Sequence, residues 1–188
     1  ILCPSEITED IASDKGYDTI YLPLGVSGKY FKPLGKQRSG IGFAGNTGNK
    51  PEEQMQAVYE PIRDNWDIEV VTDKRTPQEL NEWYNQKLVT IGMTVKEQEK
   101  VGMVNNRVFE ALASGTPLIM NEHRSLDSVL GMDYPYQSGN LDKTKSIVRE
   151  ILSDKDRVAS EFHDYSTYIR KKHNYKKRFR KLFCSIYN

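Results

Sequence analysis

Short apolar runs alternate with amphipathic stretches along most of this chain. The runs are bounded by polar or turn-forming residues and predict buried strands at residues 40–44, 67–71, 87–92 and 116–120, with one more at 134–139. Strands separated by segments of helical length pair in parallel and carry helices on both faces of the sheet. The pattern therefore predicts an α/β fold, a Rossmann-like doubly wound parallel sheet.

Capping residues locate two of the connecting helices. Thr76 before Pro77 predicts a helix over residues 77–86, and an Asn cap with a closing Gly115 predicts another over residues 105–115. A helix with Met55, Val58, Tyr59 and Ile62 on one face is expected before them, and Pro61 should bend it or end it early. Apolar spacing predicts further helices around residues 125–130, over residues 147–152, and as one long amphipathic helix from residue 156 into the basic end.

The two ends of the chain differ from this alternating centre. The first 34 residues end in YLPLGVSGKYFKPLG, whose glycines and prolines are typical of a linker. The sequence begins without Met, so we expect it to be a piece of a longer protein. The predicted organisation is a linker and domain end at 1–36, a Rossmann-like domain at 37–155, and an amphipathic helix with a basic tail at 156–188.

Charge is balanced over the chain but not along it. The formal net charge is +1, whereas residues 170–181 hold eight of the 27 basic residues and no acidic one. Overall balance argues against nucleic acid as a partner. The basic stretch has three interpretations, in order of preference: a solvated helix end favoured by the helix dipole, a contact with a further domain, and peripheral contact with an anionic membrane.

The cysteine usage and the hydropathy of the chain favour a cytoplasmic location and argue against a zinc site. Cys3 and Cys184 stand at opposite ends, in a spacing that suits neither a disulfide framework nor a zinc site. No apolar run approaches the roughly 18 residues of a membrane span. We expect a cytoplasmic location, with the inner membrane face reached only through residues 170–181.

Ligands of open parallel sheets bind beyond the carboxyl ends of the strands. The loops at that edge read GNTGNK, TDKRT, MTVKEQEKVGMVNN and NEHRS, and all four carry basic residues that could meet phosphate. Polar loops also occur simply because they face water.

The segment 105–120, NNRVFEALASGTPLIM, is the most informative. It places the amino end of a capped helix, with its unpaired N–H groups and positive dipole end, beside Arg107, and this arrangement suits an anion. Glu110, one turn further, could accept two hydrogen bonds from a vicinal diol such as a ribose. The alternative is an ordinary amphipathic helix with a solvated Glu.

Three ordered stretches resemble the carboxyl-terminal, nucleotide-sugar-binding domain of GT-B glycosyltransferases. FEALASGTPLI is similar to the stretch that lies against the donor, LPLGVSGKYFKP to the interdomain linker, and GIGFAGN to the first strand and glycine turn. Within this family the sequence is most similar to the CgeB-like, group 1 branch. The tail of that branch carries a His-x-Tyr motif, which resembles His173-Asn174-Tyr175 here. The resemblance covers nearly the whole chain and implies the carboxyl-terminal half of a GT-B architecture.

The resemblance implies roles for individual residues. Glu110 would hold the donor ribose, while Arg107, the amides near Asn105 and Asn106, and Lys50 would face the diphosphate. The loop after the second strand would read the nucleobase, although it could equally be a solvated turn, and a loop residue such as His123 could contact the sugar or simply be exposed. The residues expected to bind the donor are Asn46, Thr47, Lys50, Lys74, Arg75, Asn105, Asn106, Arg107, Glu110 and His123.

Two positions depart from the family pattern. Asn46 stands where many retaining relatives have Arg, and Gly102 stands where they have a second Glu. Both missing groups normally touch the transferred sugar or its phosphate. Retaining and inverting courses are therefore both open.

The resemblance implies transfer of a glycosyl group from a nucleotide sugar to a hydroxyl acceptor, in glycan or cell-surface polysaccharide synthesis. Cationic side chains and helix N–H groups would stabilise the leaving diphosphate, so no metal or cofactor is expected. An amino-terminal domain would bind the acceptor and supply the catalytic acid or base. This segment alone is therefore expected to be inactive, and none of its residues is assigned a catalytic role.

Two alternatives stay open. A nucleotide-sugar epimerase on the same scaffold would need paired carboxylates and a His, for which only Glu110, Glu122 and His123 are available. A non-catalytic nucleotide-binding or interaction module is favoured by Gly102 and Asn46. Neither the nucleobase nor the sugar can be read from these residues.

Overall fold

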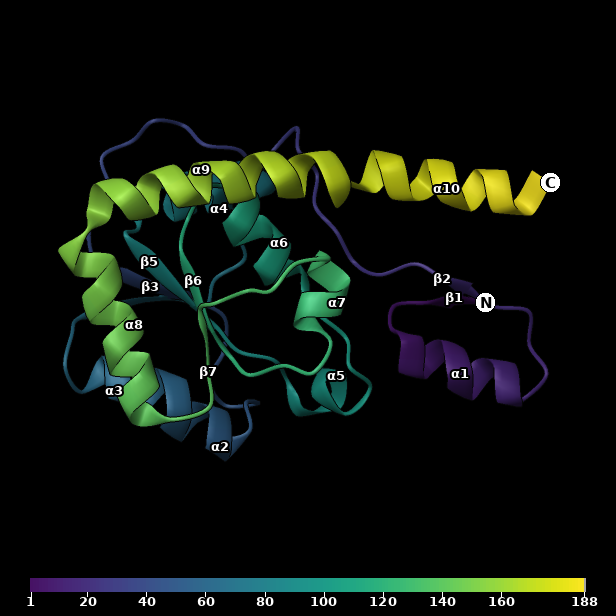
Figure 1. Ribbon diagram of the computed structural model, residues 1–188, viewed down its shortest axis with the longest axis horizontal. Coiled ribbons are helices and arrows are strands. Elements are labelled where there is room, and N and C mark those ends of the chain that lie inside the picture. The colour runs from purple at the N-terminus through teal and green to yellow at the C-terminus, as the bar shows by residue number, and fades with distance from the viewer. Residues whose placement is uncertain (188) are drawn as a thin grey trace.

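A five-stranded parallel sheet forms the centre of the computed structural model, which describes residues 1–187 (Figure 1). The strand order is β4-β3-β5-β6-β7, and every neighbouring pair is parallel. This confirms the predicted α/β fold. The strands are β3 (Ile41–Ala44), β4 (Ile68–Val71), β5 (Val89–Gly92), β6 (Leu118–Asn121) and β7 (Gln137–Ser138).

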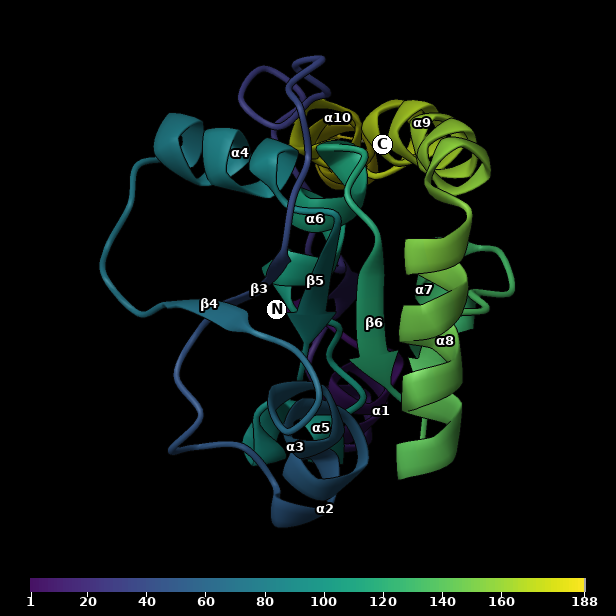
Figure 2. The same ribbon diagram turned by 90° about the vertical axis from the view of Figure 1, so that its left-hand side faces the viewer.

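The winding direction of the sheet reverses beside β3. Ile41 of β3 lies opposite Ile68 of β4 on one side and Val89 of β5 on the other, because the chain runs outward to β4 and then crosses back to β5. Right-handed crossovers in opposite directions place their helices on opposite faces. Figure 2 shows α4 and α6 on one face, with α2, α3 and α8 on the other.

The helices of the central domain begin and end close to the predicted positions. Thr76 accepts a hydrogen bond from the Glu79 N–H at 3.3 Å, and Gly115 follows α6 with a φ of +69°. No helix of residues 1–187 is both long and apolar enough to cross a membrane. The helices that follow β3 are α2 (Glu52–Gln54), the π-helical η1 (Met55–Tyr59), α3 (Glu60–Arg63), α4 (Pro77–Gln86), α5 (Lys96–Lys100), α6 (Asn106–Ala113), α7 (Leu126–Leu130), α8 (Leu141–Ser153), α9 (Lys155–Lys172) and α10 (Tyr175–Tyr187).

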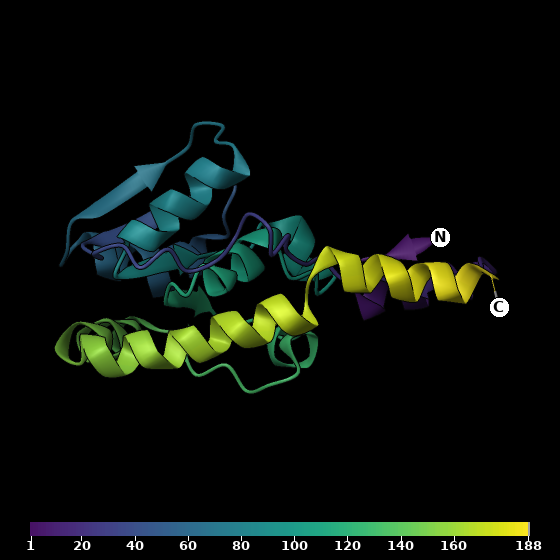
Figure 3. The same cartoon turned by 90° about the horizontal axis from the view of Figure 1, so that it is seen from above.

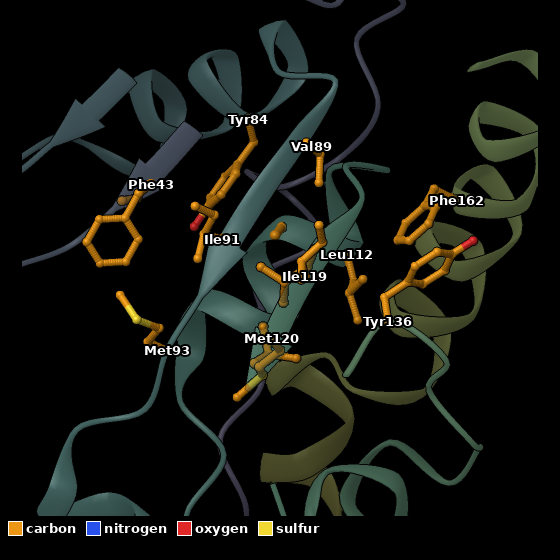
Figure 4. Packing of buried hydrophobic residues seen from close by; sticks show 14 of the residues in the cluster. Phe43, Tyr84, Val89, Ile91, Met93, Leu112, Ile119, Met120, Tyr136 and Phe162 are labelled. Atoms are coloured by element: carbon orange, nitrogen blue, oxygen red, sulfur yellow. The ribbon is translucent and has the colours of Figure 1, made fainter. Parts of the chain in front are cut away.

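The core joins the sheet to the helices above it. Ile119 and Met120 of β6 are fully buried, as is Leu112 of α6 (Figure 4). Phe162 of α9 packs against Tyr136, with ring centroids 5.2 Å apart. Burying such large apolar side chains is the main favourable contribution to folding, and it fixes α9 across the top of α6.

Pro61 bends the helix upstream of itself instead of ending it. The ring of Pro61 has no N–H with which to bind the Ala57 carbonyl, and the chain passes through the π-helical η1 before continuing to Arg63. The Ala57 carbonyl accepts a hydrogen bond from the Thr144 hydroxyl of α8 at 2.7 Å instead. A side chain on a distant helix thus satisfies the group that Pro61 leaves unpaired.

We expect Thr144→Val to lower the free energy of unfolding by about 1–3 kcal/mol, because the Ala57 carbonyl would lose its partner while staying largely shielded from water. Urea unfolding followed by circular dichroism measures this change. Thr144→Ser keeps the hydroxyl and is the matched control, with a loss well below that of the valine variant. A loss in the serine variant with none in the valine variant would mean that packing of the methyl group, not the hydrogen bond, matters at this position.

The first 34 residues are not only a linker. The segment β1 (Leu2–Cys3), α1 (Glu6–Asp14) and β2 (Ile20–Tyr21) forms a small parallel β-α-β unit. The irregular residues that follow are tied to the main domain: the Lys32 N–H donates to Asn81 at 3.0 Å and the Leu34 N–H donates to Asn85 at 2.7 Å. The predicted linker is therefore held in place by buried Asn side chains of α4.

The predicted single carboxyl-terminal helix is two helices, α9 and α10, which meet at a break at His173 and Asn174. At this break the Val26 N–H donates to the His173 carbonyl at 3.0 Å, and the Tyr175 N–H donates to the Val26 carbonyl at 3.1 Å. Figures 1 and 3 show α10 extending from the body beside the amino-terminal unit. The basic stretch at 170–181 thus spans the break, and its second part, in α10, runs back beside the start of the chain.

Candidate functional site

The carboxyl ends of β3, β4, β5 and β6 lie along one edge of the sheet, and the predicted site residues follow them in four loops. The loop after β5 and the amino end of α6 contribute the centre of this group. Here the Met93 carbonyl accepts hydrogen bonds from Lys50 Nζ at 3.0 Å and from Asn105 Nδ2 at 3.3 Å. One backbone oxygen therefore ties the loop after β3 to the cap of α6.

Two cations meet at the amino end of α6. Burial lowers the pKa of Lys50, and the nearby positive charge of Arg107 lowers it further. Asn105 caps the helix by accepting from the Arg107 N–H at 3.0 Å, while the N–H groups of Asn105 and Asn106 donate to no partner in the described chain. The arrangement combines two positive side chains with free amides at a positive dipole end, which is the composition of an anion site.

Glu110 lies one turn further along α6 and is mostly buried. Its carboxylate accepts from Arg107 Nη1 at 2.9 Å. Burial raises the pKa of Glu110, whereas the Arg107 guanidinium lowers it. Tyr84 of α4 is fully buried near both side chains, and burial strongly raises its pKa. Glu110 is thus a carboxylate whose charge depends on one neighbouring cation.

Asn46 and Thr47 build the turn that carries Lys50. The Asn46 side chain accepts from the Gly48 N–H at 2.8 Å, and the Thr47 carbonyl accepts from the Lys50 N–H at 3.1 Å. Asn46 is exposed at the same edge as the Lys50–Arg107 group. The structure therefore gives Asn46 a turn-forming role and leaves its outer face accessible.

Lys74 and Arg75 lie apart from this group, after the edge strand β4. Lys74 is exposed, and Arg75 pairs with Asp73 at 3.4 Å. No interaction in the described chain joins either side chain to Lys50, Arg107 or Glu110. Both residues therefore lie at the same edge of the sheet as Lys50, Arg107 and Glu110 but do not contact these three side chains.

His123 follows β6 and is buried, not an exposed loop residue. Its Nδ1 accepts from the Ser125 N–H at 3.3 Å, and burial lowers its pKa, with Arg124 adding to the effect. Its Nε2 is buried and makes no hydrogen bond within the described residues. A cavity of about 580 Å³ adjoins it, lined also by Glu122, Arg124 and Lys143.

The structure explains why Gly102 replaces a family Glu. Gly102 has a φ of +64°, and a Cβ there would lie 2.6 Å from Ser125 Oγ and 3.3 Å from Ile7 of α1. Both the backbone conformation and the crowding disfavour any side chain. The left-handed conformation and the nearby Ser125 and Ile7 side chains thus leave little room for a side chain at this position.

The two carboxylates that an epimerase would require have different partners. Glu110 pairs with Arg107, whereas the exposed Glu122 pairs with Lys143 at 3.6 Å. A paired acid and base would have to share one substrate position. The geometry does not bring them together.

Three residues of this region were not singled out from the sequence: Tyr84, Gln54 and Thr94. Buried Gln54 accepts from the Thr94 N–H at 3.0 Å and donates to Glu99 at 2.9 Å, and the buried Thr94 hydroxyl has no partner among the described residues. Gln54 lies four residues before Val58, so it is a polar residue on an otherwise apolar face. A polar residue at such a position was the one sign in the sequence that Gln54 has a buried hydrogen-bonding role.

Comparison with known proteins connects this geometry to a family. Residues 34–183 match the family described as glycosyl transferase-like. The structure resembles that of sucrose-phosphate synthase from Thermosynechococcus elongatus, with a TM-score of 0.65 and 14% sequence identity over 98% of this chain and 58% of that one. At this identity the likeness concerns the fold, and the chain spans 58% of the length of that GT-B enzyme. No curated protein sequence matches the chain.

Proposed function

Because this chain belongs to the glycosyl transferase-like family, we propose that it is the donor-binding half of a two-domain glycosyltransferase that moves a glycosyl group from a nucleotide sugar to a hydroxyl acceptor. The observation that carries the proposal is the convergence of Lys50, Arg107 and the free N–H groups of α6 beside Glu110 at the carboxyl edge of the sheet. Nucleotides bind at this edge in doubly wound folds.

The diphosphate of the donor would lie at the amino end of α6. Its charge is met by the free amides of Asn105 and Asn106, by Arg107 and by Lys50. Charge grows on the diphosphate as the glycosidic bond breaks, so groups already fixed around it stabilise the transition state more than the bound donor. Lys50 is fixed by its bond to the Met93 carbonyl, which supports this role.

Glu110 would accept hydrogen bonds from the two hydroxyl groups of the donor ribose. This role needs the ionised carboxylate, and Arg107 is the neighbour that lowers the Glu110 pKa against burial. Arg107 would exchange part of its contact with Glu110 for the phosphate, which leaves carboxylate oxygens free for the ribose. One cation thus serves both halves of the nucleotide.

The remaining assignments follow from the same proposal. Residues 1–36 would be the linker and the end of an amino-terminal domain, residues 37–155 the donor domain, and residues 156–188 the crossing helices. The acceptor would be a hydroxyl group in glycan or cell-surface polysaccharide synthesis. The amino-terminal domain would bind it and supply the acid or base that acts on it, so this segment alone would not catalyse transfer. Lys74 and Arg75 would approach the nucleobase, and His123 the sugar. The enzyme would work in the cytoplasm.

Calorimetric titration with UDP, GDP, ADP and CMP tests the proposal directly. We expect one nucleotide to bind preferentially and Glu110→Ala and Arg107→Ala each to weaken it by about 1–3 kcal/mol, since each removes hydrogen bonds to a charged group. Arg149→Ala, which removes an exposed positive charge from α8, is the control and should bind like the unchanged chain.

Binding that Arg149→Ala weakens as much as Arg107→Ala, and that Glu110→Ala does not weaken, would reduce the effect to net charge. Absence of nucleotide binding at millimolar concentration, with the fold intact by circular dichroism, would remove the donor-site assignment. It would favour the non-catalytic interaction module, in which the sheet is retained and the chemistry lost.

A further inference from the structure

A second polar cavity lies at the point where the two ends of the donor domain cross. It measures about 410 Å³, within the range of small-molecule sites. Its walls come from the segment after Val26, from the last turn of α9, and from the start of α10. The lining residues are Val26, Ser27, Gly28, Lys29, Arg170, Asn174, Tyr175 and Lys176.

The cavity is cationic. Lys29, Arg170 and Lys176 line it, and none of the lining residues is acidic. Lys29 Nζ lies 5.1 Å from the centre of the Tyr30 ring, a contact that holds a cation at the rim without neutralising it. Three positive charges around one open cavity repel one another, and an anion between them would relieve this repulsion.

Arg170 supplies the most specific signal. Its Nε is buried and has no hydrogen-bond partner in the described chain. A Cβ at Gly28 would lie 3.9 Å from this Nε and equally far from Cβ and Cγ of Arg170, so the Arg170 side chain runs alongside this glycine. A buried charged donor without an acceptor is costly and usually marks a place for an ion or a ligand.

The facing turn offers further donors. The Ser27 carbonyl accepts from the N–H groups of Tyr30 and Phe31, each at 3.0 Å, and closes a single helical turn. The N–H groups of Gly28 and Lys29, at the open end of this turn, donate to nothing in the described residues. The two residues that carry these free amides line the same cavity as Arg170.

We propose that this cavity binds a phosphoryl group, held by Arg170, Lys176 and the amides of the turn at Ser27–Lys29. The cavity is separate from the Lys50–Arg107 group, although it adjoins it: Tyr175, one of its walls, donates from its hydroxyl to Asn106 of α6 at 3.1 Å. The phosphoryl group belongs either to a second phosphorylated molecule or to the nucleotide itself. The inference does not depend on the donor-site proposal, because none of the residues that carry it is shared.

Titration of the chain with inorganic phosphate, followed by amide NMR, tests the site. We expect saturable binding with shifts at Gly28 and Lys29, weakened about tenfold or more by Arg170→Gln and about two- to fivefold by Lys176→Gln. Lys177→Gln removes the same charge from the next residue of α10, which does not line the cavity, and should leave binding unchanged. Arg107→Ala should also leave it unchanged.

A second arm identifies the source of the phosphoryl group. Phosphate that still binds when a nucleoside diphosphate saturates the chain supports a second phosphorylated molecule, and competition combined with sensitivity of the nucleotide to Arg170→Gln supports the nucleotide. The proposal is overturned if phosphate does not saturate, if Arg170→Gln has no effect, if Lys177→Gln weakens binding as much as Lys176→Gln, or if the loss occurs only in Arg107→Ala.

Discussion

Gly25→Ala is expected to lower the free energy of unfolding by about 3 kcal/mol or more, because the added methyl group has no room. A Cβ at this position would lie 2.4 Å from the His173 carbonyl oxygen and 2.9 Å from Arg178 Nε. The backbone cannot retreat easily, since Val26 is bonded on both sides to the break between α9 and α10. For a chain of this length the melting temperature should fall by roughly 6–12 °C.

Gly28→Ala is the matched control, three residues away in the same segment. A Cβ there would meet only Arg170 atoms at 3.9 Å, an ordinary contact. Differential scanning calorimetry of both variants compares a crowded glycine with an uncrowded one. A Gly25→Ala loss no greater than that of Gly28→Ala would show that the crossing can open to admit a methyl group without cost.

Acidification is expected to destabilise the chain through His173. Burial and the neighbouring Arg178 lower the pKa of His173 from 6.5 to about 4. Below pH 6.5 His173 becomes protonated in the unfolded chain, whereas in the folded chain it stays neutral down to about pH 4. The free energy of unfolding therefore falls as the pH drops from 6.5 to 4, and the full contribution of neutral His173 is present above pH 6.5. After allowance for partial exposure, the loss is about 2 kcal/mol.

The ring contacts of His173 explain why it stays neutral. Arg178 Nη2 lies 3.1 Å from Nδ1, which must accept, so Nε2 carries the proton and donates to the Leu130 carbonyl at 3.0 Å. The imidazole also packs against Phe109, with ring centroids 5.7 Å apart. A second proton would point directly at a guanidinium.

The free energy of unfolding in urea, measured at pH 7 and at pH 4.5, tests the contribution of His173 to acid sensitivity. His173→Gln should lose less stability between the two values than the unchanged chain does, and His163→Gln, which replaces an exposed histidine of α9, should lose the same amount as the unchanged chain. Equal losses in the unchanged chain and in His173→Gln would assign the acid sensitivity to the carboxylates instead.

Local signals predicted the central domain well. Thr76 and Asn105 mark helix starts because their side chains bond to amides within the same turn, and Gly115 marks an end because it adopts a left-handed conformation. Such interactions involve residues close in sequence. The strands were found for a similar reason, since a short apolar run is itself the signal for a buried strand.

Features that depend on distant partners were missed or mispredicted. The π-helical η1 needs Thr144, 87 positions after Ala57, to accommodate Pro61. The break between α9 and α10 depends on Val26, which no helical periodicity reveals. Likewise α1 was overlooked because its apolar residues are few and none of the residues in it is buried.

In the candidate site too, contacts between residues close in sequence could be predicted, whereas contacts between distant residues could not. Arg107 and Glu110 share one helix, so their proximity could be expected from their spacing. The contact of Lys50 with the Met93 carbonyl, the burial of His123 and the place of Tyr84 each depend on how separate strands align. The resemblance of the sequence to a family supplied the roles, but only packing shows which groups meet.

The pairing of Val26 with Asn174 also determines how the two parts of the chain can move. The polypeptide enters and leaves the sheet domain at this single point, and hydrogen bonds fasten the incoming and outgoing strands together. Sliding one part past the other would break both bonds, whereas rotation about the point preserves them. Beyond it α10 continues for 13 residues, roughly 20 Å at the rise of an α-helix. A rotation at the crossing would therefore carry α10 with it, and a rotation of a few degrees across the helix axis would move the far end by roughly an ångström or more.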